Sequence, residues 1–160
     1  TFGKGNAGNI AIKASQGVNV RGWLSSDVND TGEGNSGGIT IDTSTLTLEN
    51  GGLISASTFG KGNAGKIEIQ ATEGVTVGEN AALSSGVFDT GEGNSGGITI
   101  DTSTLTLEKG GFINASTFGK GNAGNIAIKA SQGVNVRENA LLSSTVSWHF
   151  FVVKIRETLC

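Results

Sequence analysis

The chain of 160 residues lacks proline, methionine and tyrosine, and it contains one cysteine and one histidine. A single cysteine excludes an internal disulfide framework, and a single histidine excludes a histidine-rich metal site. No apolar run approaches the roughly 18 residues of a membrane span, so none is expected. Charged residues are only 16% of the chain and the net charge is −3, which argues against nucleic acid as a partner because phosphate binding needs a concentrated basic face.

Glycine and small polar residues are abundant instead, with 27 glycines, 17 threonines, 16 serines and 14 asparagines. Such a composition also occurs in flexible linkers, but hydrophobic residues form 36% of this chain and recur at regular positions. Because the sequence starts at Thr1 without a methionine, we expect it to be a piece of a longer array of repeats.

An internal repeat organises residues 1–146. The segment TFGKGNAG occurs three times, and the related segment GEGNSGGITI occurs once between each pair of copies. Every copy contains a turn asparagine next to glycine, and successive turn asparagines are 29, 28, 31 and 28 residues apart. These asparagines are Asn6, Asn35, Asn63, Asn94 and Asn122.

Each repeat of about 29 residues carries three short segments of alternating polarity, the pattern of strands with one buried face. In the first repeat these segments lie within residues 10–13, 18–20 and 24–28. No segment shows a helical period, so the sequence predicts an all-β fold, a parallel β-helix of about five coils with three short strands each. Equivalent strands would stack at ~4.8 Å. The core would contain an aliphatic column of Ile10, Ile39, Ile67, Ile98 and Ile126.

Two columns of charged residues test this stacking, because equivalent residues in adjacent coils lie opposite one another and should not carry like charges. Both columns alternate in sign, with one neutral step at Gln70. We expect charge ladders that specify register more than they stabilise, since an exposed pair contributes less than ~1 kcal/mol. The first column is Lys4, Glu33, Lys61, Glu92 and Lys120. The second column is Lys13, Asp42, Gln70, Asp101 and Lys129.

Polar residues that recur in every repeat are more typical of a structural role than of a ligand-binding site. Stacked turn asparagines would form a structural ladder that satisfies the turn backbone, with ligand contact as the alternative. The threonines of residues 40–47 and 99–106 suit exposed strand faces. A flat threonine array is also typical of ice-binding solenoids, but here Lys, Gln, Glu and Asn interrupt it in every second coil.

Residues that could carry catalysis are few, and we predict that the chain is not an enzyme. His149 has no second ligand or triad partner nearby in the sequence. Asp42 and Asp101 would lie two coils apart, about 9.6 Å, a separation that an inverting polysaccharide hydrolase could use. Both aspartates recur with the repeat, however, whereas an active site would interrupt it.

Weak surface calcium binding is the other hypothesis for the carboxylates. Asp30 with Glu33, and Asp89 with Glu92, place two acidic side chains near a glycine turn. The alternate coils carry lysine at the glutamate position, which disfavours an all-oxygen cage. No metal and no cofactor is therefore expected.

Two segments depart from the repeat. Residues 21–23 replace the five residues 78–82, which makes that turn two residues shorter and places Trp23 in it. Trp23 is a candidate for contact with a glycan, and packing into the shortened corner is the alternative. Residues 147–160 contain the only cysteine and histidine, and they are either a cap on the last coil or a truncated or out-of-frame end.

The unit GNAGNI, followed by GV-x-V, LSS and STFGKGNAG, resembles the repeats of large filamentous-haemagglutinin-like exoproteins, particularly those common in cyanobacteria. The resemblance covers roughly residues 1–146. It implies a right-handed β-helix in a secreted or surface-attached protein, exported through an outer-membrane transporter by two-partner secretion. The implied function is a non-catalytic shaft that supports adhesion or aggregation, and no functional residue carries over. The alternative is a module that binds a glycan or matrix ligand on a Thr/Asn-rich face, and a polysaccharide-active enzyme is a distant third.

Overall fold

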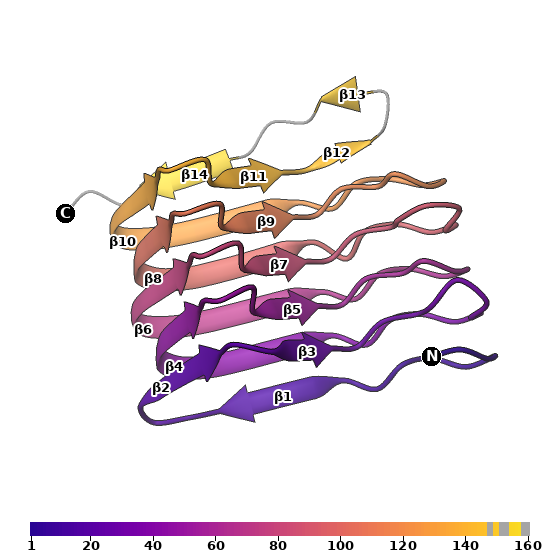
Figure 1. The fold of residues 1–160 in the computed structure, drawn as a ribbon, viewed down its shortest axis with the longest axis horizontal. Helices are drawn as coiled ribbons and strands as arrows, with labels where there is room; N and C mark the ends of the chain where they lie inside the picture. Colours follow the sequence, from indigo (N-terminus) through magenta and orange to yellow (C-terminus); the bar gives the residue numbers. More distant parts are fainter. Residues whose placement is uncertain (147–148, 151–153, 158–160) are drawn as a thin grey trace.

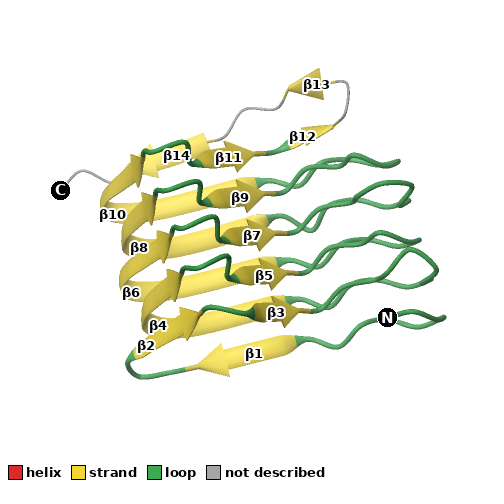
Figure 2. Ribbon diagram, in the orientation of Figure 1, coloured by secondary structure: helices red, strands yellow, loops and turns green. Residues whose placement is uncertain are grey.

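The computed structural model describes residues 1–146, 149–150 and 154–157, and these residues form strands, turns and loops without a helix. Five coils stack along one axis, and each coil contributes to a long sheet and to a short sheet (Figure 1, Figure 2). No helix long and apolar enough to cross a membrane occurs in the described part of the chain. The prediction of an all-β solenoid of stacked parallel coils is confirmed.

The strands pair in three sheets. The long parallel sheet has the order β1-β4-β6-β8-β10-β14, and β2 also pairs with β4. Its strands are β1 (Ile10–Lys13), β2 (Gly17–Val20), β4 (Ile39–Leu48), β6 (Ile67–Val77), β8 (Ile98–Leu107), β10 (Ile126–Val136) and β14 (Lys154–Glu157). The short parallel sheet consists of β3 (Trp23–Ser25), β5 (Leu53–Ser55), β7 (Ala82–Ser84), β9 (Phe112–Asn114) and β11 (Leu141–Ser143). An antiparallel pair consists of β12 (Thr145–Val146) and β13 (His149–Phe150).

The predicted register holds across all five coils. The aliphatic column pairs in the expected order, from Ile10 opposite Ile39 to Ile98 opposite Ile126. The isoleucines of the middle coils are almost fully buried, because each alternates with an outward-facing residue and packs against the short sheet. The column is Ile10, Ile39, Ile67, Ile98 and Ile126.

The number of strands per coil differs from the prediction after the first coil. Coil 1 has three strands, β1 to β3. Coils 2 to 5 consist of β4 and β5, β6 and β7, β8 and β9, and β10 and β11, and in each of them the first two predicted strands form one bent strand of 10 or 11 residues. At the bend, the Thr43 hydroxyl and the Ser44 amide both donate to the Gln16 carbonyl, so the ladder continues around the corner. Alternating polarity predicts which face a residue occupies, but it does not show whether a corner interrupts the hydrogen bonds.

Three local length changes explain the irregular repeat spacing. Coils of 28 residues are the shortest, and coil 3 has one extra residue at the bend, between Ala71 and Gly74. Its closing loop, from Val87 to Glu92, is also two residues longer than the loop from Thr58 to Lys61. Coil 1 has the same additions but a turn two residues shorter, which gives the spacing of 29.

Serine and threonine occupy part of the core. The Ser26 hydroxyl donates to the Gly8 carbonyl across the coil at 2.6 Å, and Ser85 donates to Gly65 at 2.6 Å. These bonds satisfy glycine turns that have no strand neighbour on that side. An inward column alternates valine with threonine at Val28, Thr58, Val87 and Thr117.

The structure describes part of the predicted C-terminal segment. β14 extends the long sheet by parallel pairing with β10, where Ala127 lies opposite Lys154 and Lys129 opposite Arg156. His149 lies in β13, opposite Val146. The rest of the segment, residues 147–148, 151–153 and 158–160, lies outside the described residues. Its interpretation as a cap or as a truncated end stays a prediction.

Candidate binding surfaces

The turn asparagines lie in one column along the solenoid. In each step, the side-chain Oδ1 of one asparagine accepts a hydrogen bond from the backbone N–H of the next asparagine. These four bonds measure 2.8, 2.8, 2.8 and 2.9 Å. The amide oxygens of the first four asparagines are therefore engaged with the next coil, and the Asn122 side-chain N–H also donates to Asn94 Oδ1 at 3.1 Å. The column is Asn6, Asn35, Asn63, Asn94 and Asn122.

A glycine precedes each of these asparagines because the coils approach very closely there. Gly62 has φ +134°, and a Cβ atom added to it would lie 2.0 Å from the carbonyl oxygen of Gly34. No side chain fits at that distance, and L-residues rarely adopt that φ. In each Gly-Asn pair, the glycine thus allows the backbones of adjacent coils to approach closely, and the asparagine side chain forms a hydrogen bond between the coils.

The first charge column lies beside the asparagines and alternates in sign. Lys4 Nζ lies 3.3 Å from Glu33, and Lys120 Nζ lies 2.9 Å from Glu92. The hydrogen bond and the charge attraction from Lys120 lower the pKa of Glu92, and the same two interactions with Glu92 raise the pKa of Lys120. The column consists of Lys4, Glu33, Lys61, Glu92 and Lys120, each opposite the next.

The second charge column contains both carboxylates that were considered for hydrolysis. Asp42 pairs with Lys13 at 3.5 Å, and Asp101 pairs with Lys129 at 3.3 Å. Gln70 lies between the two aspartates in register. Both carboxylates are about half exposed and paired with a lysine, so neither lies in the apolar pocket that a general acid typically occupies.

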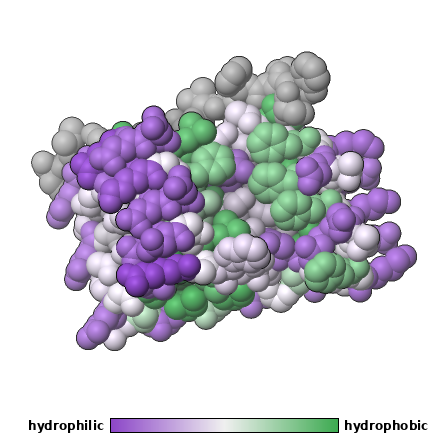
Figure 3. Space-filling model, in the orientation of Figure 1, coloured by the Kyte–Doolittle hydropathy of each residue, from purple (hydrophilic) through white to green (hydrophobic). Residues whose placement is uncertain are grey.

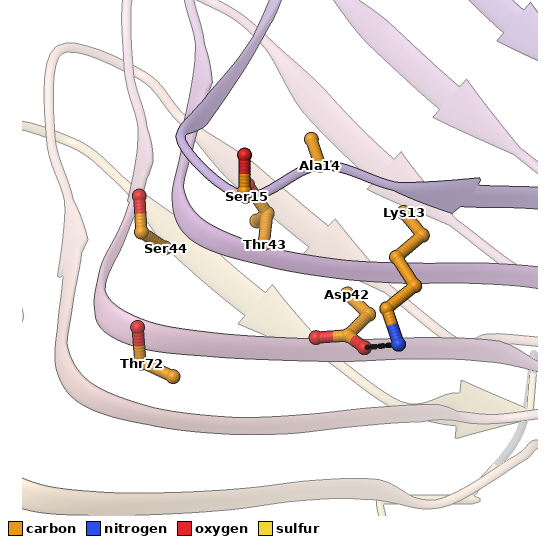
Figure 4. Close-up of a pocket in the computed structure, with 7 residues that line it drawn as sticks. All are labelled: Lys13, Ala14, Ser15, Asp42, Thr43, Ser44 and Thr72. Carbon is orange, nitrogen blue, oxygen red and sulfur yellow. Dashed lines mark ion pairs between the residues drawn. The ribbon is translucent and has the colours of Figure 1, made fainter.

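A shallow pocket of about 480 Å³ adjoins this column at the corner of coils 1 to 3 (Figure 4). The Lys13–Asp42 ion pair lies at one side of it. Hydroxyl groups of Ser15, Ser44 and Thr72 follow one another along the corner. This set offers hydrogen bonds but neither an activated nucleophile nor an unpaired base.

Sequence reasoning missed a third set of ion pairs, which lies in two adjacent columns on the turns after the long strands. Arg21 pairs with Glu49, Lys109 with Glu79 at 3.6 Å, and Arg137 with Glu108. A hydrogen bond from Asn19 and then one from Arg21 lower the pKa of Glu49. Aligning the turn residues coil by coil would have revealed these pairs.

The predicted Thr/Asn-rich face lies on the second half of the long strands. One outward column contains only threonine and asparagine, and the column beside it alternates threonine with glycine. Since a glycine interrupts the second column in every odd coil, the face is not a continuous threonine array. The first column is Asn19, Thr47, Thr76, Thr106 and Asn135. The second column is Gly17, Thr45, Gly74, Thr104 and Gly133.

Apolar side chains gather over the short sheet and the adjoining loops (Figure 3). Phe59, Phe88 and Phe118 form a stack with ring centroids 5.3 and 5.6 Å apart. The sequence analysis missed this stack, although each phenylalanine directly follows an inward-facing residue of the repeat. The first outward column of the short sheet is entirely apolar and consists of Trp23, Leu53, Ala82, Phe112 and Leu141.

Coil 1 interrupts the repeat on this same face. Trp23 does not fill the shortened turn, because its side chain is 84% exposed. Four residues further on, Asp27 replaces the serine, glycine or threonine of other coils. Its Oδ1 accepts hydrogen bonds from the Ser55 hydroxyl at 2.7 Å and the Ser57 amide at 2.6 Å. Asn29 then occupies the position of the stacked phenylalanines.

The structure does not assemble the carboxylates considered for calcium into a cage. Glu33 and Glu92 form ion pairs with lysines, and an oxygen of Asp30 accepts from the Thr31 amide at 3.0 Å. Within the described residues, no group of three or more His, Cys, Asp or Glu side chains could hold a metal ion.

Comparisons with protein-family models, curated proteins and solved structures find no match to this chain. The resemblance to exoprotein repeats therefore rests on the sequence motifs alone, and the function that it implies is a proposal.

Proposed function

We propose that this chain is a structural shaft segment of a secreted or surface-attached exoprotein, exported through an outer-membrane transporter. The observation that supports this most is the interchangeability of the coils. Both parallel sheets run through all five coils in one register, and the same asparagine bonds and charge alternation recur at each step. A rod built this way gains length by adding coils, because each coil contacts only its neighbours.

A second candidate function, binding of a glycan or matrix ligand, is supported by coil 1. A shaft needs no coil that differs from the others, yet Trp23 is 84% exposed at the one shortened turn. An exposed indole is a suitable platform for a sugar ring, which stacks through its C–H groups. Asp27, on the same outward side of the strand, could accept hydrogen bonds from sugar hydroxyls.

A glycan array and a panel of matrix proteins would distinguish the two candidates. The shaft function predicts no saturable binding that depends on Trp23. Saturable binding that disappears in Trp23→Ala, with an unchanged β-rich circular dichroism spectrum, would contradict the pure shaft and support the binding module. Leu53→Ala is the matched control, since Leu53 is the next residue in the same outward column.

A further inference from the structure

The phenylalanine stack ends at coil 1, where Asn29 replaces a ring. Phe59 stacks on Phe88 on one side, and on its other side the backbone places Asn29 in the column. The same hydrogen bond marks each position: the Phe59 amide donates to the Val28 carbonyl at 2.7 Å, and the Asn29 amide donates to the Thr1 carbonyl at 2.9 Å. One face of the Phe59 ring therefore has no aromatic neighbour among the described residues.

The two long closing loops flank this open ring. The loops of residues 29–33 and 88–92 are two residues longer than the loop of residues 59–61 that lies between them. The extra residues include Asp30 and Asp89. The result is a hollow of about 310 Å³ lined by Asn29, Asp30, Phe59 and Asp89.

The chemistry of this hollow is an aromatic ring surrounded by hydrogen-bond acceptors. Asp30 and Asp89 are exposed, and neither forms an ion pair with any residue that the structure describes. Only one oxygen of Asp30 is engaged, by the Thr31 amide. Asp89 has φ 54°, in the left-handed region that non-glycine residues occupy at a cost. The hollow thus combines negative charge with a ring face and lacks a cation.

We propose that this hollow, named here the Phe59 notch, binds the guanidinium group of an arginine from a partner protein. A guanidinium is planar and packs well on aromatic rings, so it can lie against Phe59 between the two aspartates. Its five N–H donors match the carboxylates of Asp30 and Asp89 and the amide oxygen of Asn29. This inference goes beyond the shaft function and is compatible with it.

The size of the notch favours arginine over smaller cations. The two aspartates belong to loops two coils apart, a separation of about 9.6 Å along the axis. An ammonium group donates all its hydrogen bonds, of about 2.8 Å, from one nitrogen. It therefore reaches both aspartates less well than a guanidinium group, whose three nitrogens are spread over a wider plane. A calcium ion needs six to eight oxygens at about 2.4 Å, more than these side chains supply.

The test is an NMR titration of the full 160-residue chain with the peptide acetyl-Gly-Arg-Gly-amide. We expect saturable shifts centred on the amides of Asn29 and Phe59, with an affinity in the millimolar range that is typical of a single side chain. The equivalent lysine peptide should bind several-fold more weakly. An uncharged methyl glycoside should leave these amides unchanged.

Two variants and one control locate the site. Asn29→Phe inserts the ring that other coils have and should weaken binding about tenfold or more, because it fills the space that the guanidinium needs. Asp30→Asn with Asp89→Asn leaves the core untouched and should also weaken binding, which keeps the test valid if Asn29→Phe does not fold. Glu73→Gln removes one carboxylate charge at a distant exposed corner and should have no effect.

Three results would overturn the proposal. Shifts that never saturate, or equal binding of arginine and lysine peptides, would mean general charge attraction. Binding that survives Asn29→Phe in a folded protein would place the ligand elsewhere. Glycoside binding without arginine binding would make the notch a sugar site. In the matrix-protein panel, binding of a protein that is lost in Asn29→Phe but kept in Trp23→Ala would support the notch while leaving the shaft function intact.

Discussion

The effect of a single residue in this solenoid can be compared with that of the equivalent residue in a neighbouring coil. The inward column that alternates valine and threonine gives a direct comparison, because Val28, Thr58, Val87 and Thr117 share one environment. Thr117 donates its hydroxyl to the Asn122 carbonyl at 2.7 Å. The Thr58 hydroxyl is fully buried and has no hydrogen-bond partner in the part of the chain that the structure describes.

Thr58→Val should therefore stabilise the protein by about 1 kcal/mol, because it removes an unsatisfied buried hydroxyl and keeps the side-chain shape. The free energy of unfolding from urea titration measures the effect. Thr117→Val is the matched control and should be neutral or destabilising, since it removes a hydroxyl that forms a bond. Equal changes in both variants would contradict this account of the column.

The asparagine column connects structural elements, because each side-chain hydrogen bond joins two adjacent coils. Asn63→Ala removes the acceptor for the Asn94 amide and should cost about 1 kcal/mol of unfolding free energy. Asn63→Asp keeps an acceptor oxygen and should cost less than alanine. Urea unfolding of both variants and of the parent protein measures these differences in the free energy of unfolding. An alanine variant as stable as the parent would show that water can replace the hydrogen bonds of the asparagine column.

The charge columns give the solenoid a dependence on pH. Hydrogen bonding from Lys120 places the pKa of Glu92 below its ordinary value of 4.5 in the folded state. The pairing therefore contributes stability above that value, and the contribution is lost as the pH falls through the folded-state pKa. We expect the melting temperature to fall between about pH 5 and about pH 3. Glu92→Gln should show a smaller fall, and an identical fall would assign the acid sensitivity to other carboxylates.

Most of the fold could be predicted from the repeat, because stacking forces equivalent residues into columns. The positions of Ile39, Asn63 and Glu92 follow from their spacing alone. The continuous bend at Thr43 could not be predicted, since it depends on hydroxyl bonds to the preceding coil. The exposure of Trp23 also depends on the backbone path of a turn that occurs only once in the chain.

The surfaces were harder to predict than the core. An inward position has only a few acceptable residues, whereas outward positions tolerate many, so Phe59 carries no periodic polarity signal. The stack of Phe59 with its neighbours can be recognised only when the closing loops, which differ in length, are aligned by the β-bridges that precede them. The notch beside Phe59 results from Asn29 in place of a phenylalanine and from differences in loop length. A search for repeats looks for what the coils share, so it does not detect these two features.

At the scale of the whole molecule, charge alternation makes the two-coil unit the natural step of this rod. Removing residues 59–117 joins Thr58 to Phe118 and leaves three coils in which Glu33 still faces a lysine. Removing residues 59–87 joins Thr58 to Phe88 and leaves four coils in which Glu33 faces Glu92. The second deletion also places Asp42 opposite Asp101.

Salt should raise the melting temperature of the one-coil deletion but not that of the two-coil deletion. In the one-coil deletion, like charges repel along two columns, so raising NaCl from about 20 mM to about 500 mM should screen them and raise the melting temperature. In the two-coil deletion and in the parent protein, the same salt screens attraction and should lower the melting temperature or leave it unchanged. Comparing the sign of the response separates charge register from coil number, because the one-coil deletion has more coils and a larger core. If both deletions shifted in the same direction, charge would not determine which coils can be neighbours.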